Sequence, residues 1–313
     1  MTTKQENIFC VLGPTCSGKT SLAFEIIDNL IGDIDCEIVS VDSAMIYKDM
    51  NIGTATPSEV ELQQYPHHLI NICDPGESYS AAKFYNDVKK SIANIKSRNK
   101  TPILVGGTAL YFKVLQHGIN LMPNSDYKIR EYLYEEMESK GVTELHEKLQ
   151  LVDKLYANKI SKYDKQRVIR ALEVYMISGK PLSYFHSFPK HRSDYCFKNI
   201  LILPEREYLR GQISIRFKSM LKNGFLEEVE NLLRKYNLTQ ENQSIRCVGY
   251  RQAFLHLTGK QSYADMIEDS VNATRQLAKR QNTWFKNWDN VLSFSSIDSA
   301  SINKTLQIIR KVI

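Results

Sequence analysis

The sequence predicts an α/β protein, with a parallel sheet core flanked by helices and an all-helical domain inserted into it. Short apolar runs alternate with helical patterns, which is typical of parallel strands joined by crossover helices. A glycine-rich turn follows the first of these runs directly. A long stretch between the fourth and fifth runs carries helical patterns and no strand pattern, which indicates the insertion.

Five strands are predicted, at residues 8–12, 37–41, 68–72, 102–105 and 198–203. Helices are predicted at 21–30, 109–117, 126–140, 142–151, 154–160, 165–178, 205–222, 226–236, 250–257 and 263–287. The chain therefore divides into a first core part (1–118), a helical insertion domain (119–197) and a second, mainly helical core part (198–313). The polar segment 181–193 is expected to return the chain to the core.

Composition limits the class of protein. The 313 residues are 42% hydrophobic, and the net charge of +6 favours a polyanionic partner where the charges cluster. We expect no membrane segment, because no apolar run is long enough to span a bilayer and the polar start does not resemble a signal peptide. Six scattered cysteines show no zinc spacing, which indicates free thiols in a reducing cytoplasm. We read His67 and His68 as strand packing rather than metal ligands, and expect a monomer.

The glycine-rich turn carries the strongest motif in the chain. Its residues, 13–20, match G-x-x-x-x-G-K-[ST] and consist of Gly13, Pro14, Thr15, Cys16, Ser17, Gly18, Lys19 and Thr20. Between a buried strand and a helix, such a turn aims its backbone N–H groups at one phosphate site. The core is therefore predicted to be P-loop NTPase-like. Lys19 would reach the distal phosphates, and Thr20 would hold a Mg²⁺ ion shared with them. A nucleoside triphosphate or any diphosphate ester would satisfy these donors.

Asp42 ends the second predicted strand, at the sheet edge where parallel strands place their ligands. It could ligand the metal or accept a proton from a nucleophile beside the phosphates, or it could simply cap a helix at 44–48. The strand at 102–105 runs into Gly106-Gly107 without the terminal acid that ATPases place there. This absence argues against a plain ATPase.

One single arginine and three clusters of basic residues stand out. Arg216 falls on the apolar face of its predicted helix, where it needs a phosphate or a carboxylate partner. Residues 159–180 carry six Lys or Arg and two acids, residues 271–286 carry four basic residues and no acid, and Arg246 and Arg251 bracket a short loop. Each cluster could be a solvated face, but together with a phosphate loop they indicate a nucleic-acid surface.

With these residues in place, the chain resembles the tRNA dimethylallyltransferase family, also called tRNA isopentenyltransferases. Seven ordered blocks carry the resemblance: GPTCSGKTSLA (13–23), VSVDSAMIYKDMNIGTATP (39–57), DPGESYSAAKF (74–84), PILVGGTALYFKVL (102–115), QRVIRALEVYMISGKPL (166–182), SIRCVGYRQ (244–252) and ATRQLAKRQNTWF (273–285). The segment 161–165 departs from the family, since many relatives have a histidine and a proline-rich turn there. The zinc-finger tail of some eukaryotic relatives is also absent.

The resemblance implies transfer of a dimethylallyl group from dimethylallyl diphosphate to the N6 amine of the adenine next to the tRNA anticodon on its 3′ side. By this resemblance, Asp42 would be the general base. The developing charge on the diphosphate would be stabilised by Lys19, Arg216 and a Mg²⁺ cofactor held by Thr20. The family also implies the residues that contact tRNA: Asp42, Ser43, Ala44, Met45, Thr108, Arg130, Gln166, Arg167, Val168, Ile169, Arg170, Arg246, Cys247, Val248, Gly249, Tyr250 and Arg251. Three alternatives remain: a nucleotide kinase or ATPase, a prenyltransferase acting on free adenine nucleotides, and an RNA-binding protein with a regulatory phosphate site.

Overall fold

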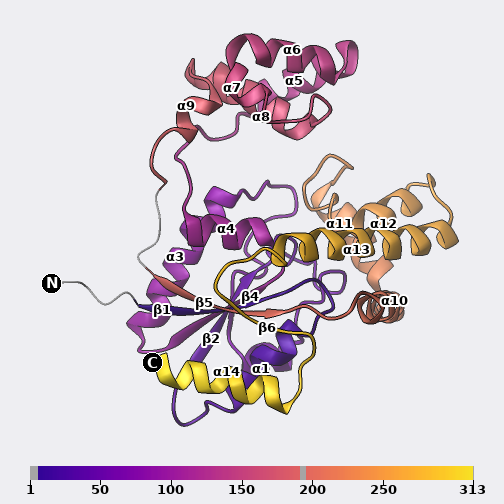
Figure 1. The fold of residues 1–313 in the computed structure, drawn as a ribbon. Coiled ribbons are helices and arrows are strands. Elements are labelled where there is room, and N and C mark those ends of the chain that lie inside the picture. Colours follow the sequence, from indigo (N-terminus) through magenta and orange to yellow (C-terminus); the bar gives the residue numbers. More distant parts are fainter. Residues whose placement is uncertain (1–5, 191–194, 313) are drawn as a thin grey trace. The chain divides into compact units, whose positions relative to one another are not determined.

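The computed structural model describes residues 6–190 and 195–312, which contain the six-stranded parallel sheet of Figure 1. The strands are β1 (Asn7–Leu12), β2 (Cys36–Val41), β3 (His67–His68), β4 (Thr101–Gly106), β5 (Cys196–Ile202) and β6 (Val291–Phe294), in the order β3-β2-β4-β1-β5-β6. Phe9 of β1 pairs with Ile103 of β4 and with Lys198 of β5, so β1 lies inside the sheet. Its residues Ile8 to Leu12 are buried because helices cover both sheet faces.

The helices of the sheet core are α1 (Lys19–Asp28), α2 (Glu59–Gln64), α3 (Ala81–Ser97), α4 (Ala109–His117), α10 (Arg206–Lys222), α11 (Phe225–Tyr236), α12 (Tyr250–Leu257), α13 (Tyr263–Phe285) and α14 (Ser299–Val312). Contacts separate the chain into two compact units, unit 1 (Met1–Gln116 with Asp194–Ile313) and unit 2 (His117–Ser193). Unit 2 contains α5 (Tyr127–Lys140), α6 (Val142–Val152), α7 (Lys154–Ala157), α8 (Lys165–Ser178) and α9 (Leu182–His186).

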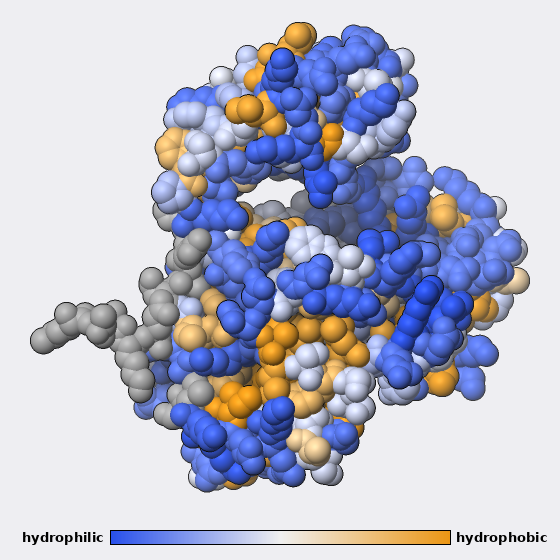
Figure 2. Space-filling view, in the orientation of Figure 1, coloured by the Kyte–Doolittle hydropathy of each residue, from blue (hydrophilic) through white to orange (hydrophobic). Residues whose placement is uncertain are grey.

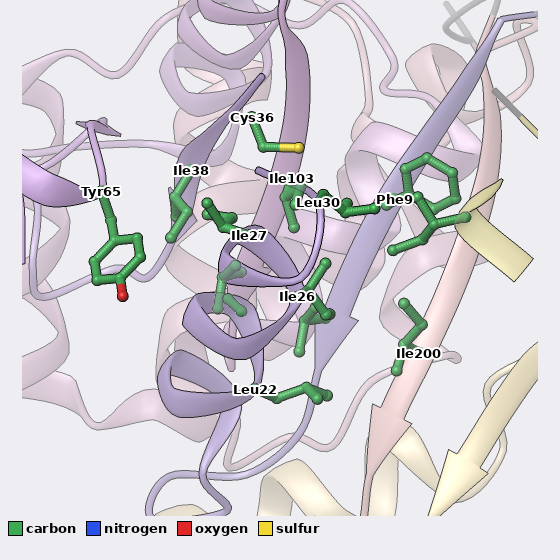
Figure 3. Close-up of a cluster of buried hydrophobic side chains, with 14 of the residues drawn as sticks. Phe9, Leu22, Ile26, Ile27, Leu30, Cys36, Ile38, Tyr65, Ile103 and Ile200 are labelled. Atoms are coloured by element: carbon green, nitrogen blue, oxygen red, sulfur yellow. The ribbon is translucent and has the colours of Figure 1, made fainter. Parts of the chain in front are cut away.

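One face of the sheet packs on α1 and α14. Leu22, Ile26 and Ile27 of α1 point toward side chains of the strands, among them Phe9 and Ile103 (Figure 3). Leu306 and Ile309 of α14 complete this cluster. Because side chains alternate along a strand, neighbouring positions such as Cys10 face the other side, where Gln116 of α4 donates a hydrogen bond to its sulfur (3.8 Å). The α/β prediction is confirmed.

Several predicted elements need correction. The strand predicted at 68–72 is reduced to β3, because Leu69 and Asn71 adopt left-handed backbone conformations (φ 61° and 52°) that break an extended strand. The strand β6 and the helices α2, α3, α9 and α14 were not predicted. The strand β6 is only four residues long and is held by its pairing with β5. The helix α14 does carry a helical pattern, since Ile302, Leu306 and Ile309 recur on the face that packs on the core. Residues 191–193 of the predicted connecting segment lie outside the described residues.

His67 and His68 have structural partners, as predicted. His68 Nε2 lies 2.7 Å from Glu37 Oε2, and the buried Glu37 carboxylate also binds Arg98 and Lys100. The Arg98 guanidinium, together with these other partners, outweighs the effect of burial and lowers the pKa of Glu37 to about 2. This ion cluster lies at the amino end of β2, away from the sheet edge that carries the glycine-rich turn.

Candidate active site

The phosphate loop connects β1 to α1 and is shaped by its glycines. Gly18 precedes α1 in a left-handed conformation (φ 87°), and Cys16 has a φ of 60°. A Cβ atom at Gly13 would lie 2.5 Å from the carbonyl oxygen of Ile202, so only glycine fits beside β5. These conformations turn the loop around the amino end of α1, where N–H groups favour an anion.

The Lys19 side chain folds back onto this loop. Its ammonium donates a hydrogen bond to the carbonyl oxygen of Pro14 (2.5 Å). Burial lowers the pKa of Lys19 to about 8; the Asp42 carboxylate opposes this shift and the Arg216 guanidinium adds to it. Because the pKa of Lys19 is lowered, its charged form is less stable here than in water. A phosphate anion bound beside it would stabilise the charged form again.

Two further loop side chains show that the loop suits an anion. Ser17 Oγ is buried and has no hydrogen-bond partner among the described residues. Thr15 Oγ1 accepts a hydrogen bond from Arg216 Nη2 (2.5 Å), which brings α10 to the loop. Arg216 therefore points at the phosphate loop, and no carboxylate is bonded to it in the described part of the chain. Arg216 could have had a carboxylate or a phosphate as its partner, and the structure favours the phosphate.

Gln281 of α13 is a site residue that the sequence patterns did not single out. Its Oε1 accepts a hydrogen bond from the backbone N–H of Thr15 (2.8 Å), and its Nε2 donates one to the carbonyl oxygen of Gly107 (2.8 Å). The one available signal was its place inside the block 273–285. A glutamine there has no periodicity or spacing that assigns it a partner more than two hundred residues away.

Asp42 lies at the carboxyl end of β2, beside the loop. Its Oδ1 accepts hydrogen bonds from the backbone N–H groups of Ala44 (2.8 Å) and Met45 (3.3 Å). Residues 44–48 form a turn, so the proposed helix-capping role is replaced by a turn-capping one. Both of these hydrogen bonds are made to Oδ1, which leaves Oδ2 to meet a substrate.

Thr108 and Cys247 also lie near Asp42. The backbone N–H of Ser43 donates a hydrogen bond to Thr108 Oγ1 (3.0 Å). Burial raises the pKa of the Cys247 thiol to about 12, and the negative charge of Asp42 contributes to this rise. Three of the predicted tRNA-contact segments, 42–45, 108 and 246–251, therefore come together at one end of unit 1.

Within segment 246–251 the residues have different roles. Gly249 and Tyr250 are buried, and the Tyr250 hydroxyl donates a hydrogen bond to Glu228 Oε1 (2.7 Å). Their side-chain positions therefore belong to the core of unit 1, and contact of this segment with RNA stays a prediction. Arg251 is exposed, and Arg246 is ion-paired with Glu241 at the surface.

The predicted contacts of unit 2 divide in the same way. Val168 and Ile169 are core residues of the helical unit, so their side chains are not available to RNA. Arg130 Nε and Arg170 Nη1 both bind the fully buried carboxylate of Glu173, at 2.9 Å and 2.6 Å. Burial raises the pKa of Glu173, but the hydrogen bonds from Arg170 and Arg130 outweigh it, so the pKa lies below its usual value. Gln166 and Arg167 are exposed at the start of α8.

The surface of unit 1 near α13 is polar and basic. Figure 2 shows hydrophilic residues over most of the visible surface of α10–α13. Lys279, Arg280 and Lys286 of this segment are exposed, and Lys113 Nζ lies over the exposed ring of Trp284 (5.0 Å to its centroid). Within residues 6–190 and 195–312, no three His, Cys, Asp or Glu side chains form a metal cluster. None of the described helices is long and apolar enough to cross a membrane.

Comparison with known proteins identifies the chain's relatives. Residues 45–288 match the model of the IPP transferase family. The chain is 47% identical over 306 residues to a tRNA dimethylallyltransferase of Legionella pneumophila, covering 97% of this chain and 96% of that protein. It is 43% identical over 311 residues to a tRNA dimethylallyltransferase of Coxiella burnetii, covering 99% of each.

Solved structures agree with the sequence comparisons. The full-length tRNA isopentenylpyrophosphate transferase of Bacillus halodurans superimposes with a TM-score of 0.70 at 32% identity, covering 99% of this chain and 97% of that one. A eukaryotic dimethylallyltransferase acting on tRNA gives a TM-score of 0.74 at 28% identity, covering 98% of this chain and 78% of that one. The phosphate loop, the acid after β2 and the full-length matches agree, and the chain belongs to the IPP transferase family.

Proposed function

We propose that this protein transfers a dimethylallyl group from dimethylallyl diphosphate to the N6 amine of the adenine next to the tRNA anticodon on its 3′ side. The observation that carries the proposal is the meeting of the phosphate loop and Asp42 at one edge of the sheet, with cations on the loop side. The sheet register brings them to the same edge, because Val41 of β2 and Leu12 of β1 both pair with Gly106 of β4. A phosphate-binding site beside a base suits displacement of a diphosphate by an amine.

The reaction breaks the allylic C–O bond, and its electron pair leaves with the diphosphate. The developing negative charge would be met by the loop N–H groups, Lys19 and Arg216, which are in place before the reaction and so need little reorganisation. The Ser17 hydroxyl, buried without a partner among the described residues, would supply one more donor. The N6 lone pair forms the new C–N bond, and the N6 proton passes to Asp42.

Asp42 is suited to this proton transfer because its orientation is fixed by the N–H groups of Ala44 and Met45. An adenine amine is a weak nucleophile, since its lone pair is delocalised into the ring. A positioned carboxylate removes the proton as the C–N bond forms. The base must leave the stack of the anticodon loop to reach Asp42.

Mg²⁺ is a cofactor that the residues of this loop could hold. The Thr20 side chain is exposed in the first turn of α1 and offers one hydroxyl oxygen. Mg²⁺ prefers oxygen ligands and commonly binds through substrate phosphates, water and few protein groups, so a single hydroxyl fits this ion. When bound, it would neutralise part of the charge on the diphosphate.

The tRNA would be bound by exposed cations of both units, each unit contributing its own set. In unit 1 these include Arg251, Lys279 and Arg280, and in unit 2 Lys165 and Arg167. Phosphate contacts of this kind supply affinity without reading sequence. We further propose that the protein acts as a cytoplasmic monomer.

Three substrates distinguish the candidate activities. Purified protein with Mg²⁺ is incubated with labelled dimethylallyl diphosphate and either unmodified tRNA or AMP, and in parallel with ATP alone. We expect label on adenosine from digested tRNA and none on AMP. Label on AMP would favour the free-nucleotide prenyltransferase, and phosphate release from ATP without prenyl transfer would favour an ATPase. Binding of tRNA without any turnover would leave an RNA-binding protein.

Asp42→Asn tests the base. Asparagine retains a side-chain oxygen for the N–H groups of Ala44 and Met45 but cannot take the N6 proton. We expect the single-turnover rate to fall by about 10²- to 10⁴-fold while tRNA and donor still bind. The control is Asp35→Asn, an exposed acid just before the other end of β2. An unchanged rate in Asp42→Asn would remove Asp42 as the base.

A further inference from the structure

We propose that Gln281 is a positioning residue of the transfer, which fixes the phosphate loop relative to the turn after β4 and thereby aligns the donor with Asp42. This inference rests on the proposed function. Gln281 lies on α13, a helix that contributes none of the diphosphate-binding residues assigned above. Its side chain nevertheless bonds the two backbone segments between which the reaction would take place.

The amide group suits this position because the two segments present opposite hydrogen-bonding groups. The loop presents the N–H of Thr15, which needs an acceptor, and the turn presents the carbonyl oxygen of Gly107, which needs a donor. Gln281 satisfies both at 2.8 Å each. A carboxylate could meet only the first, an ammonium only the second, and an apolar side chain neither.

The packing around the amide leaves little freedom. A Cβ atom on Gly107 would lie 2.6 Å from Gln281 Nε2 and 3.1 Å from the carbonyl oxygen of Gly13. The turn, the loop and the amide therefore approach one another closely, and a side chain at position 107 would displace the Gln281 amide. Thr15 is fixed twice, by Gln281 through its N–H and by Arg216 through its hydroxyl.

The turn continues this arrangement to the base. Thr108 follows Gly107, its N–H donates a hydrogen bond to the carbonyl oxygen of Val41 (3.2 Å), and its hydroxyl accepts one from Ser43 N–H (3.0 Å). Val41 and Ser43 flank Asp42 in the chain. Gln281 thus bonds the loop that would hold the leaving group to the turn after β4, and Thr108 of that turn bonds the two residues that flank the base.

The test uses two substitutions at Gln281 and the same two at Gln276, an exposed glutamine of α13. Gln281→Met keeps the approximate shape and removes both hydrogen bonds. Gln281→Glu keeps the acceptor, loses the donor and adds negative charge beside the diphosphate. For each full-length variant we would measure the single-turnover rate at saturating donor and tRNA, the donor KM, the tRNA Kd, the Kd of inorganic pyrophosphate with Mg²⁺, and Tm.

We expect the saturating rate of Gln281→Met to fall about 100-fold, as for a misplacement of about 1 Å, with the tRNA Kd within about twofold of wild type. Gln281→Glu should be slower still and should bind pyrophosphate more weakly than Gln281→Met. Both Gln276 variants should match wild type. A Gln281→Met rate within twofold of wild type would overturn the proposal, as would a lowered Tm with a normal rate for the folded enzyme. Absence of prenyl transfer by the wild type would instead refute the proposed function, and the pyrophosphate measurement would still test Gln281.

Discussion

At the scale of single residues, the site is a balance of charges around one loop. Lys19 is partly desolvated, lies near a second cation in Arg216, and is compensated by Asp42. Two cations therefore face one carboxylate, and a diphosphate would neutralise the local excess of positive charge. Sequence spacing identified Lys19 and Asp42 because the loop motif and the strand end place them without long-range information, whereas Arg216 stood out by its place on the apolar face of a helix.

The lowered pKa of Lys19 predicts a pH dependence of anion binding. As pH rises through about 8, free Lys19 loses its proton, so pyrophosphate affinity should fall from that pH upward. A bound anion favours the charged lysine, so binding near pH 8 should take up a proton. Calorimetry in buffers of different ionisation enthalpy measures this uptake.

Lys19→Arg is the control for this measurement, because a guanidinium stays charged across the range. It corrects for the protons of pyrophosphate itself, which both proteins experience equally. The wild type should show additional uptake and a steeper decline of affinity. Equal uptake by the two proteins would show that Lys19 is already fully charged in the free enzyme.

At the scale of elements, loops between the helices are fixed by single carboxylates. Glu228 of α11 accepts hydrogen bonds from the N–H groups of Asn51, Ile52 and Gly53, at 2.8, 2.6 and 3.1 Å. It also accepts one from the Tyr250 hydroxyl, at the start of α12. One side chain therefore joins the loop after β2 to the segment 246–251. A Cβ atom on Gly53 would lie 2.4 Å from Phe225, so this loop can approach only with glycine there.

Glu228→Gln should weaken this junction, because its amide NH₂ would face donors instead of accepting from them. Leaving partly buried donors unpaired should lower the free energy of unfolding by about 1 kcal/mol, measured by urea titration. We also expect a weaker tRNA affinity with an unchanged pyrophosphate affinity, since the phosphate loop lies on other elements. Glu227→Gln, an exposed neighbour on the same helix, is the control. Unchanged stability and tRNA affinity would show that the junction holds without the carboxylate.

At the scale of the whole molecule, two units with separate cores would share one substrate. The core of unit 2 includes Leu145, Leu149 and Val168. Two arginines that were expected to bind RNA, Arg130 and Arg170, form ion pairs with the buried Glu173. Lys165 and Arg167 remain exposed at the start of α8, although Arg167 lies 3.2 Å from Asp164. The basic excess of this unit is therefore concentrated in fewer accessible groups than the sequence indicates.

Reversing the charges of Lys165 and Arg167 to Glu should weaken tRNA binding and its salt dependence without unfolding unit 2. Removing two phosphate contacts should reduce the slope of log K against log salt by about 1.5. The matched control is Lys154→Glu, an exposed lysine at the start of α7 and outside the basic cluster at 159–180. Filter binding across a salt series gives both slopes. An unaltered slope in the double variant would exclude the start of α8 from the RNA surface.

The sequence by itself determined the α/β class, the phosphate loop, the acid after β2 and the family, because each depends on contiguous residues whose local geometry follows from their types. Only the tertiary structure decided which charged residues act as structural partners. Arg130 and Arg170 face a buried glutamate, Tyr250 belongs to the core, and Gln281 reaches the loop across 266 positions of the chain. Periodicity reports the face on which a side chain lies, but its partner is chosen by packing between distant elements. The short β3 likewise depends on its pairing with β2, which no local pattern encodes.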